Sequence, residues 1–153
     1  MEILENKVPF PQANDFEKIV KIIAIQDEAI ILNDETLGTY LDGISSRQAR
    51  YYIAAAKYLG ILDTNKRFTD IGIKIRGLNE YLQKVELARL LLSDPVFGRV
   101  YITERVLCMT LDKSDIVDII KEENPGYCEA IYYRRAQTVT SWLQWLKNIL
   151  DSN

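Results

Sequence analysis

The chain has 153 residues, of which 48% are hydrophobic and 27% charged, and its formal net charge is −3. Such a composition is typical of a globular protein with room for one full domain or two small ones. The chain has no histidine, which excludes the commonest general base, the commonest zinc ligand and every Ser-His or Cys-His pair. No apolar run is long enough to span a bilayer, and the N-terminus lacks the pattern of a signal peptide. We therefore expect a cytoplasmic protein without membrane contact.

Enzyme chemistry has little support in the remaining residues. No glycine-rich phosphate loop precedes a helix, and the acids of 112–123 have the spacing of a solvated amphipathic helix. Cys108 and Cys128 lack metal-ligand spacing, and we expect both to be free, buried thiols. The sequence predicts no catalysis, no metal and no cofactor.

Charge is distributed unevenly along the chain. Residues 14–42 carry −5, residues 43–78 carry +5, residues 112–131 carry −4 and residues 132–153 carry +2. Two basic segments in an acidic protein are consistent with a localised phosphate-binding surface, although helices of small proteins also alternate in charge by chance.

The elements of the first half follow one another closely. Residues 1–13 form an arm in which Phe10, between two prolines, packs on the body. A helix capped by Asn14 comes next, then a short β-like run over 29–32, then a helix that starts at Asn33 or Asp34 and ends at 42–43.

The next stretch, 45–60, is the most informative. Ser45 and Gln48 have capping-box spacing, and Gly60 supplies a left-handed stop. One helical face is apolar and predicted to be buried; it consists of Ala49, Tyr52, Ile53, Ala56 and Leu59. The opposite face is basic near its N-terminus and small in its middle, which suits entry into a groove of DNA.

A β-hairpin is predicted over 61–69, with Asn65-Lys66-Arg67 at its tip, followed by a helix from Asp70. This order of elements resembles a winged helix-turn-helix, and Phe68-Thr69-Asp70-Ile71-Gly72 is similar to the segment that closes the wing in bacterial regulators. The resemblance covers residues 14–78 and implies a mainly α fold with a small β-wing.

The second half, 79–153, repeats the pattern without a wing. A connector helix from Asn79 comes first, followed by a helix that starts at Asp94 and Pro95 and carries Phe97 to Leu107. Further helices are predicted over 112–123 and from Glu129 or Tyr132 to Leu150. Arg134-Arg135-Ala136-Gln137 echoes Arg47-Gln48-Ala49-Arg50, which indicates a degenerate internal duplication. We therefore expect a second helix-turn-helix-like unit.

Candidate DNA contacts lie on the two echoing helices and on the hairpin. Arginine can contact guanine and glutamine adenine if they reach base edges; otherwise such side chains hold phosphates. Protein or RNA contact is the alternative for the basic helix, and an ordinary polar turn for the hairpin tip. The candidates are Ser46, Arg47, Gln48, Arg50, Tyr51, Lys57, Lys66, Arg67, Arg134, Arg135, Gln137 and Thr138.

A wide apolar band with Trp142, Trp145 and Ile149 runs along the last helix. Such a band is more typical of packing between units or of a dimer face than of base stacking.

Three phrases carry a further resemblance: 8–18, then 47–60, then 134–145. Together they are similar to a tandem winged-helix module of bacterial type II restriction-modification proteins. The resemblance implies a duplex-DNA recognition module that is not catalytic by itself, with double-stranded DNA as its partner and a homodimer or a nuclease as a further one. The alternative is a winged-helix transcriptional regulator or a protein–protein adaptor that dimerises through its C-terminal helix.

Overall fold

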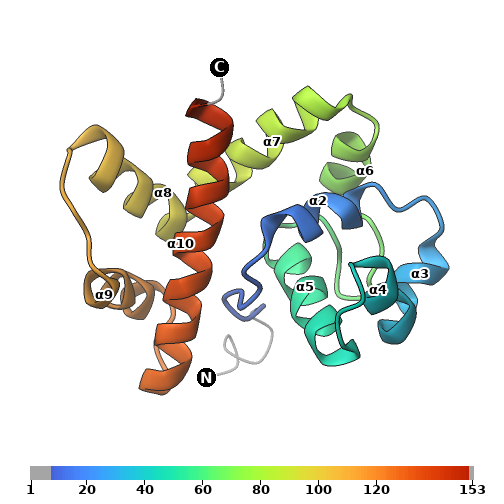
Figure 1. The fold of residues 1–153 in the computed structure, drawn as a ribbon, viewed down its shortest axis with the longest axis horizontal. Helices are drawn as coiled ribbons and strands as arrows, with labels where there is room; N and C mark the ends of the chain where they lie inside the picture. Colours follow the sequence, from blue (N-terminus) through green and yellow to red (C-terminus); the bar gives the residue numbers. More distant parts are fainter. Residues whose placement is uncertain (1–7, 152–153) are drawn as a thin grey trace. The chain divides into compact units, whose positions relative to one another are not determined.

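The structure, a computed structural model, describes residues 8–151, and these are mainly helical, as predicted (Figure 1). The first seven residues of the predicted arm lie outside the described part. The helices are α2 (Phe16–Ile23), α3 (Glu28–Leu32), α4 (Asp34–Tyr40), α5 (Ser46–Tyr58), α6 (Asp70–Arg76), α7 (Glu80–Ser93), α8 (Pro95–Tyr101), the π-helical turn η1 (Ile102–Val106), α9 (Lys113–Glu123) and α10 (Glu129–Asp151).

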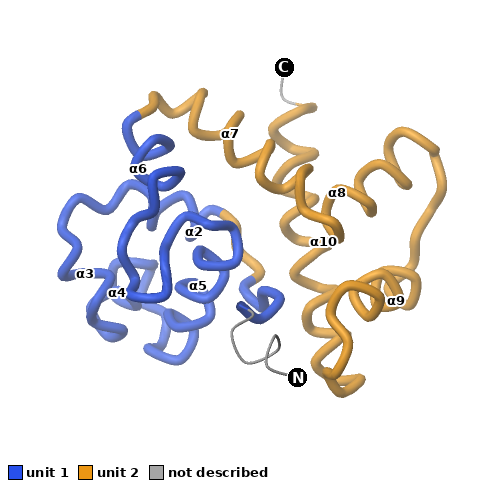
Figure 2. The backbone as a smooth tube through the Cα atoms, turned by 180° about the vertical axis from the view of Figure 1, so that it is seen from behind, with its two compact units in different colours: residues 1–13, 17–77 blue, residues 14–16, 78–153 orange. Residues whose placement is uncertain are grey.

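The chain divides into two compact units (Figure 2). Unit 1 contains residues 17–77 and the chain up to Ala13, and unit 2 contains residues 14–16 and the chain from Leu78 onward. In unit 1, α4 packs on both α3 and α5; in unit 2, α7 packs on α8, while α8, α9 and α10 contact one another.

Most helices begin where a polar side chain accepts a hydrogen bond from a backbone N–H of the first turn. Such caps satisfy donors that the helix itself leaves unpaired. The starts predicted at Asn33, Ser45, Asn79, Asp94 and Asp112 are confirmed in this way.

The β-like run predicted over 29–32 is wrong, because these residues belong to α3. Asp27 accepts a hydrogen bond from the N–H of Ala29 at 3.0 Å, so a local cap starts a helix within an apolar, β-branched segment. The burial predicted for Cys108 and Cys128 is also wrong: both are free and exposed. Neither lies inside a helix, because Cys108 follows η1 and Cys128 immediately precedes α10.

The core of unit 1 forms around α5. Its predicted inner face is buried, and Gly60 ends the helix with φ of +78°. Phe10 is only 1% exposed and meets Tyr58 edge-on, with 5.3 Å between ring centroids, so the described part of the arm packs as expected.

The core of unit 2 is built on the tryptophans of α10. Trp142 is fully buried; it stacks on Phe97 at 4.9 Å between centroids and meets Phe16 edge-on at 5.1 Å. The ring centroids of Trp145 and Phe16 lie 4.2 Å apart. The apolar band of the last helix therefore packs inside unit 2.

Candidate nucleic-acid interface

The N-terminal half of α5 presents polar and basic side chains away from the core. Arg47, Gln48 and Arg50 are exposed, while Ser46 and Tyr51 are half-buried. Arg47 Nε donates a hydrogen bond to Tyr51 Oη at 3.3 Å, and the guanidinium carbon lies 5.9 Å from the centre of the same ring. Tyr51, one turn later on the helix, therefore restrains the direction of Arg47.

The segment 62–68, called the wing turn below, carries Lys66 and Arg67. Leu62 and Phe68 form one antiparallel bridge, and the Asp63 N–H donates to the Arg67 carbonyl oxygen at 2.8 Å. Within residues 8–151 this bridge stands outside any strand, so the predicted β-hairpin is reduced to a tight turn. Lys66 occupies the left-handed region with φ of +62°, a conformation found at the tips of tight turns.

Asp63 holds the wing turn from inside. Its Oδ1 accepts hydrogen bonds from the N–H of Asn65 at 2.8 Å and of Arg67 at 3.0 Å. These backbone donors, Arg67 first, lower the pKa of the Asp63 carboxyl because they stabilise its charged form. The turn that presents Lys66 and Arg67 thus depends on an ionised carboxylate.

Thr69 and Gly72 close the turn onto α6. Thr69 Oγ1 donates to the carbonyl oxygens of Gly60 and Ile61 and accepts from the Gly72 N–H at 3.1 Å. A Cβ on Gly72 would lie 2.3 Å from the Ile61 carbonyl oxygen, so only glycine permits this approach. This is the physical basis of the Thr-x-x-Gly pattern.

Asp34 joins α4, α5 and the wing turn through one carboxylate. Its Oδ2 lies 3.4 Å from Arg50 Nη1, and its Oδ1 lies 3.3 Å from Lys66 Nζ. The side chains of Asp34, Arg50 and Lys66 are 23%, 59% and 28% exposed. Sequence reasoning missed Asp34, because its partners are 16 and 32 residues away and no local pattern links them.

The other three candidate cations of unit 1 differ from Arg50 and Lys66, because they are not paired with a carboxylate in the part of the chain that the structure describes. Within residues 8–151, Arg47, Lys57 and Arg67 form no ion pair, and Lys57 is half-buried. The structure therefore brings five basic side chains onto α5 and the adjoining wing turn, and two of them share Asp34.

Fewer of the candidate DNA contacts on α10 are exposed than the sequence predicted. Thr138 is fully buried and donates a hydrogen bond to Asn14 Oδ1 at 2.8 Å, so its assignment to an exposed DNA face is wrong. Arg135 is half-buried, with its guanidinium carbon 3.8 Å from the centre of the Tyr127 ring. Arg134 and Gln137 remain exposed, and Gln137 Nε2 donates to Ser141 Oγ at 3.3 Å.

The described residues give little support for a metal site, a membrane-spanning helix or a pocket for a small ligand. Across 8–151, no three His, Cys, Asp and Glu side chains gather as they would around a metal ion. None of the described helices has both the length and the apolar character needed to cross a bilayer. A cavity of about 90 Å³ in unit 2, lined in part by the Glu104–Lys147 pair, is smaller than pockets that hold drug-sized ligands.

Comparison with known proteins gives one match. The model of a family described as "Domain of unknown function (DUF7226)" matches residues 18–151 and so extends over both units. No curated protein and no solved structure matches the chain. The function has to be inferred from the residues themselves.

Proposed function

We propose that this chain, which belongs to the DUF7226 family of domains of unknown function, is a duplex-DNA recognition module. The observation that carries the proposal is the outer face of α5, where Arg47, Gln48 and Arg50 are exposed beside a wing turn that holds two more basic residues. This surface occurs in a protein whose net charge is −3, so its positive charge is local.

The proposed binding mode follows a winged helix-turn-helix. In it, α4 and α5 are the two helices of the motif, and the wing turn is a much-reduced wing. The N-terminal half of α5 enters the major groove, whose width admits a helix. There Arg47 and Gln48 face base edges, while Arg50, Lys57, Lys66 and Arg67 hold phosphates and fix the register.

The proposed setting is a bacterial restriction-modification or defence system. The support is the resemblance of three phrases of the sequence, at 8–18, 47–60 and 134–145, to tandem winged-helix modules of such systems. The module binds DNA in the cytoplasm and is not catalytic by itself, so cleavage or methylation belongs to another domain or to a partner. The burial of Trp142 and Trp145 inside unit 2 leaves these side chains unavailable to the alternative, a dimer that forms through the last helix.

The first test measures binding to a fluorescent duplex of random sequence by anisotropy over a range of salt concentrations. If Arg50, Lys57, Lys66 and Arg67 contact phosphates, log affinity should fall against log salt with a slope of about −3.6. No binding at low salt, where electrostatic attraction is strongest, would exclude the proposal and favour protein contact.

Two variants then locate the surface. Arg47→Ala and Arg50→Ala should each weaken binding, by about 1–3 kcal/mol for Arg47 on a selected sequence if it reads a base. Lys74→Ala is the matched control, because Lys74 is exposed on α6 of the same unit and its loss removes the same charge. An equal effect of all three variants would indicate general attraction with no defined interface.

The target sequence can be found by selecting bound duplexes from a random pool. Recovery of one common site by the wild type, and its loss with Arg47→Ala, would assign base reading to Arg47. Recovery of the same site by both proteins would instead assign Arg47 to the phosphate backbone.

A further inference from the structure

The basic surface formed by α5 and the wing turn includes one carboxylate, that of Asp34. Asp34 places one carboxylate oxygen on Arg50 and the other on Lys66, at 3.4 and 3.3 Å. Asp34 is the first residue of α4, where a negative charge is favourable, and the helix start is already capped by Asn33. Capping therefore does not require the Asp34 carboxylate, whereas its two oxygens match the two cations.

Arg50 is open enough to exchange partners, and Lys66 and Asp34 are each partly exposed. Arg50 is 59% exposed, and pairs this exposed are weak because water screens them. A phosphate offers the same kind of anionic oxygen as the carboxylate and accepts from arginine and lysine equally well. Arg50 and Lys66 can therefore leave Asp34 for DNA by side-chain rotation alone.

We propose that Asp34 is an intramolecular competitor for phosphate, which attenuates the affinity of this surface for duplex DNA. This inference rests on the proposed function. In the free protein, Asp34 holds Arg50 and Lys66 together; in the complex, both cations turn to the DNA backbone. Every phosphate contact that they make then requires a pair with Asp34 to be broken, and this keeps binding to arbitrary sequence weak.

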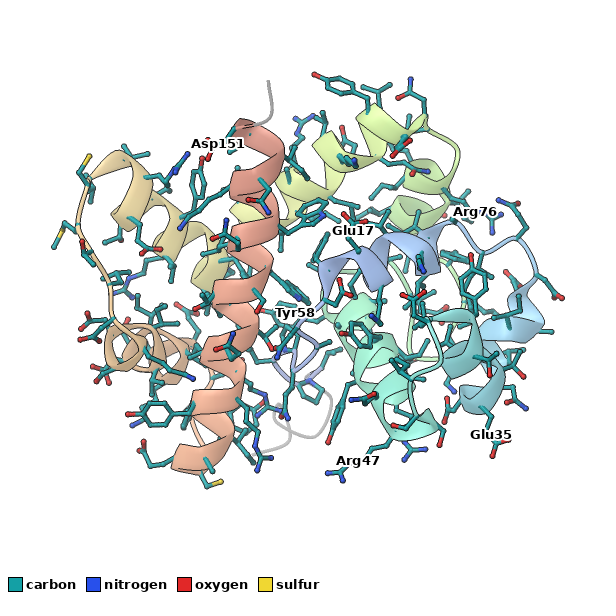
Figure 3. The ribbon with its side chains drawn as sticks, viewed as in Figure 1. Glu17, Glu35, Arg47, Tyr58, Arg76 and Asp151 are labelled. Carbon is teal, nitrogen blue, oxygen red and sulfur yellow. The ribbon has the colours of Figure 1, made fainter. Side chains whose placement is uncertain are left out.

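The chain offers a close control. Glu35 is the next residue of the same helix; it is exposed and, within the described residues, forms no ion pair. Figure 3 shows Glu35 and Arg47 toward the same end of unit 1. Glu35→Gln thus removes one negative charge near the surface without releasing a cation, and Asp34→Asn removes the same charge and releases two.

The experiment measures affinity of the full chain for the random duplex as a function of salt. Asp34→Asn should raise affinity about five- to tenfold at low salt, because two weak ion pairs no longer have to be broken. The log–log slope should stay close to that of the wild type, because Arg50 and Lys66 contact phosphates in both complexes. At the same salt concentration, Glu35→Gln should raise affinity less than Asp34→Asn does, because it removes the same charge without releasing a cation. Circular dichroism confirms that each variant is folded, and Asp34→Ser repeats the test with a different neutral side chain.

A double-mutant cycle tests the exchange directly. Arg50→Ala should reduce affinity by a larger factor in the Asp34→Asn background than in the wild type, because the wild-type arginine is partly held by Asp34. Lys66→Ala should behave in the same way. Equal factors in both backgrounds would overturn the inference.

The outcomes also separate the inference from the proposed function. If the wild type binds and Asp34→Asn matches Glu35→Gln, or binds more weakly than the wild type, the inference is wrong while DNA binding stands. If neither the wild type nor Asp34→Asn binds at low salt, both are wrong. Binding by Asp34→Asn alone would leave the wild type without DNA binding at low salt; this would exclude the proposed function and overturn the inference, which states that Asp34 attenuates the affinity of the wild type.

Discussion

Replacing Gly72 with alanine should destabilise unit 1 by forcing the wing turn and α6 apart. The added Cβ would lie 2.3 Å from the Ile61 carbonyl oxygen and 3.1 Å from Phe68 Cδ1. Because Cβ contacts below 3.0 Å essentially do not occur, the Cβ and the carbonyl oxygen must separate by at least 0.7 Å.

That carbonyl is held by its neighbours. It accepts hydrogen bonds from the Thr69 N–H at 3.0 Å and from Thr69 Oγ1 at 3.2 Å, so its displacement strains both. Overpacking of this kind costs about 1–3 kcal/mol. With a urea slope near 2 kcal/mol/M, a loss of about 2 kcal/mol should lower the midpoint by roughly 1 M.

Gly77→Ala is the matched control. The nearest atom to a Cβ on Gly77 is 3.6 Å away, and its backbone is right-handed with φ of −79°. This change should leave stability unaltered or raise it by about 0.4–1 kcal/mol, because alanine restricts the unfolded chain.

Urea unfolding followed by circular dichroism measures both variants. Tryptophan fluorescence adds a separate signal, because both tryptophans of the chain lie in unit 2 and should report it selectively. Equal midpoints for Gly72→Ala and Gly77→Ala would refute the steric argument and the role given to the Thr-x-x-Gly pattern.

Two further predictions concern single polar groups. Thr138→Val should lower the free energy of unfolding by about 0.5–1.5 kcal/mol without changing DNA affinity, because it removes a buried hydrogen bond to Asn14. Thr140→Val, at an exposed position of the same helix, should lower it by less. Thermal melts measure the stability of the two variants, and anisotropy measures their DNA affinity. A drop in DNA affinity with Thr138→Val at unchanged stability would restore Thr138 to the interface. Asp63 has a lowered pKa in the folded state, so its stabilisation of the wing turn is present above about pH 3.8 and is lost as the pH falls through the lowered value. The stability difference between the wild type and Asp63→Ala should therefore be constant near neutral pH and shrink in acid; a difference that persists at low pH would contradict this.

Features that depend on residues three or four apart could be predicted from the sequence. The Ser45 cap needs only the Gln48 N–H, and Gly60 needs only its own backbone angle, so both follow from local spacing. The inner face of α5 follows from the period of the helix for the same reason. The outer face of α5 follows as well, because it consists of the residues that remain once the inner face is assigned.

Features that depend on distant partners could not be predicted. Thr138 has a helical position that looked exposed, but its partner Asn14 lies 124 residues earlier. Arg135 resembles Arg134 in sequence, and only the fold shows that Tyr127 lies against it. The pairing of Asp34 with both Arg50 and Lys66 belongs to the same class, which is why the sequence indicated the cations and missed the anion.

The packing of Phe16 has a consequence for the order in which the chain folds. Phe16 leaves the ribosome well before the two tryptophans that cover it, Trp142 and Trp145. Their separation of at least 126 residues means that a side chain only 2% exposed in the folded unit lacks its native cover until α10 has been synthesised. Contacts of such high sequence separation form slowly, because a long loop must close first. We therefore expect unit 2 to complete its core only once α10 has emerged from the ribosome, and a nascent chain halted before α10 to expose Phe16 to chaperones or to aggregation.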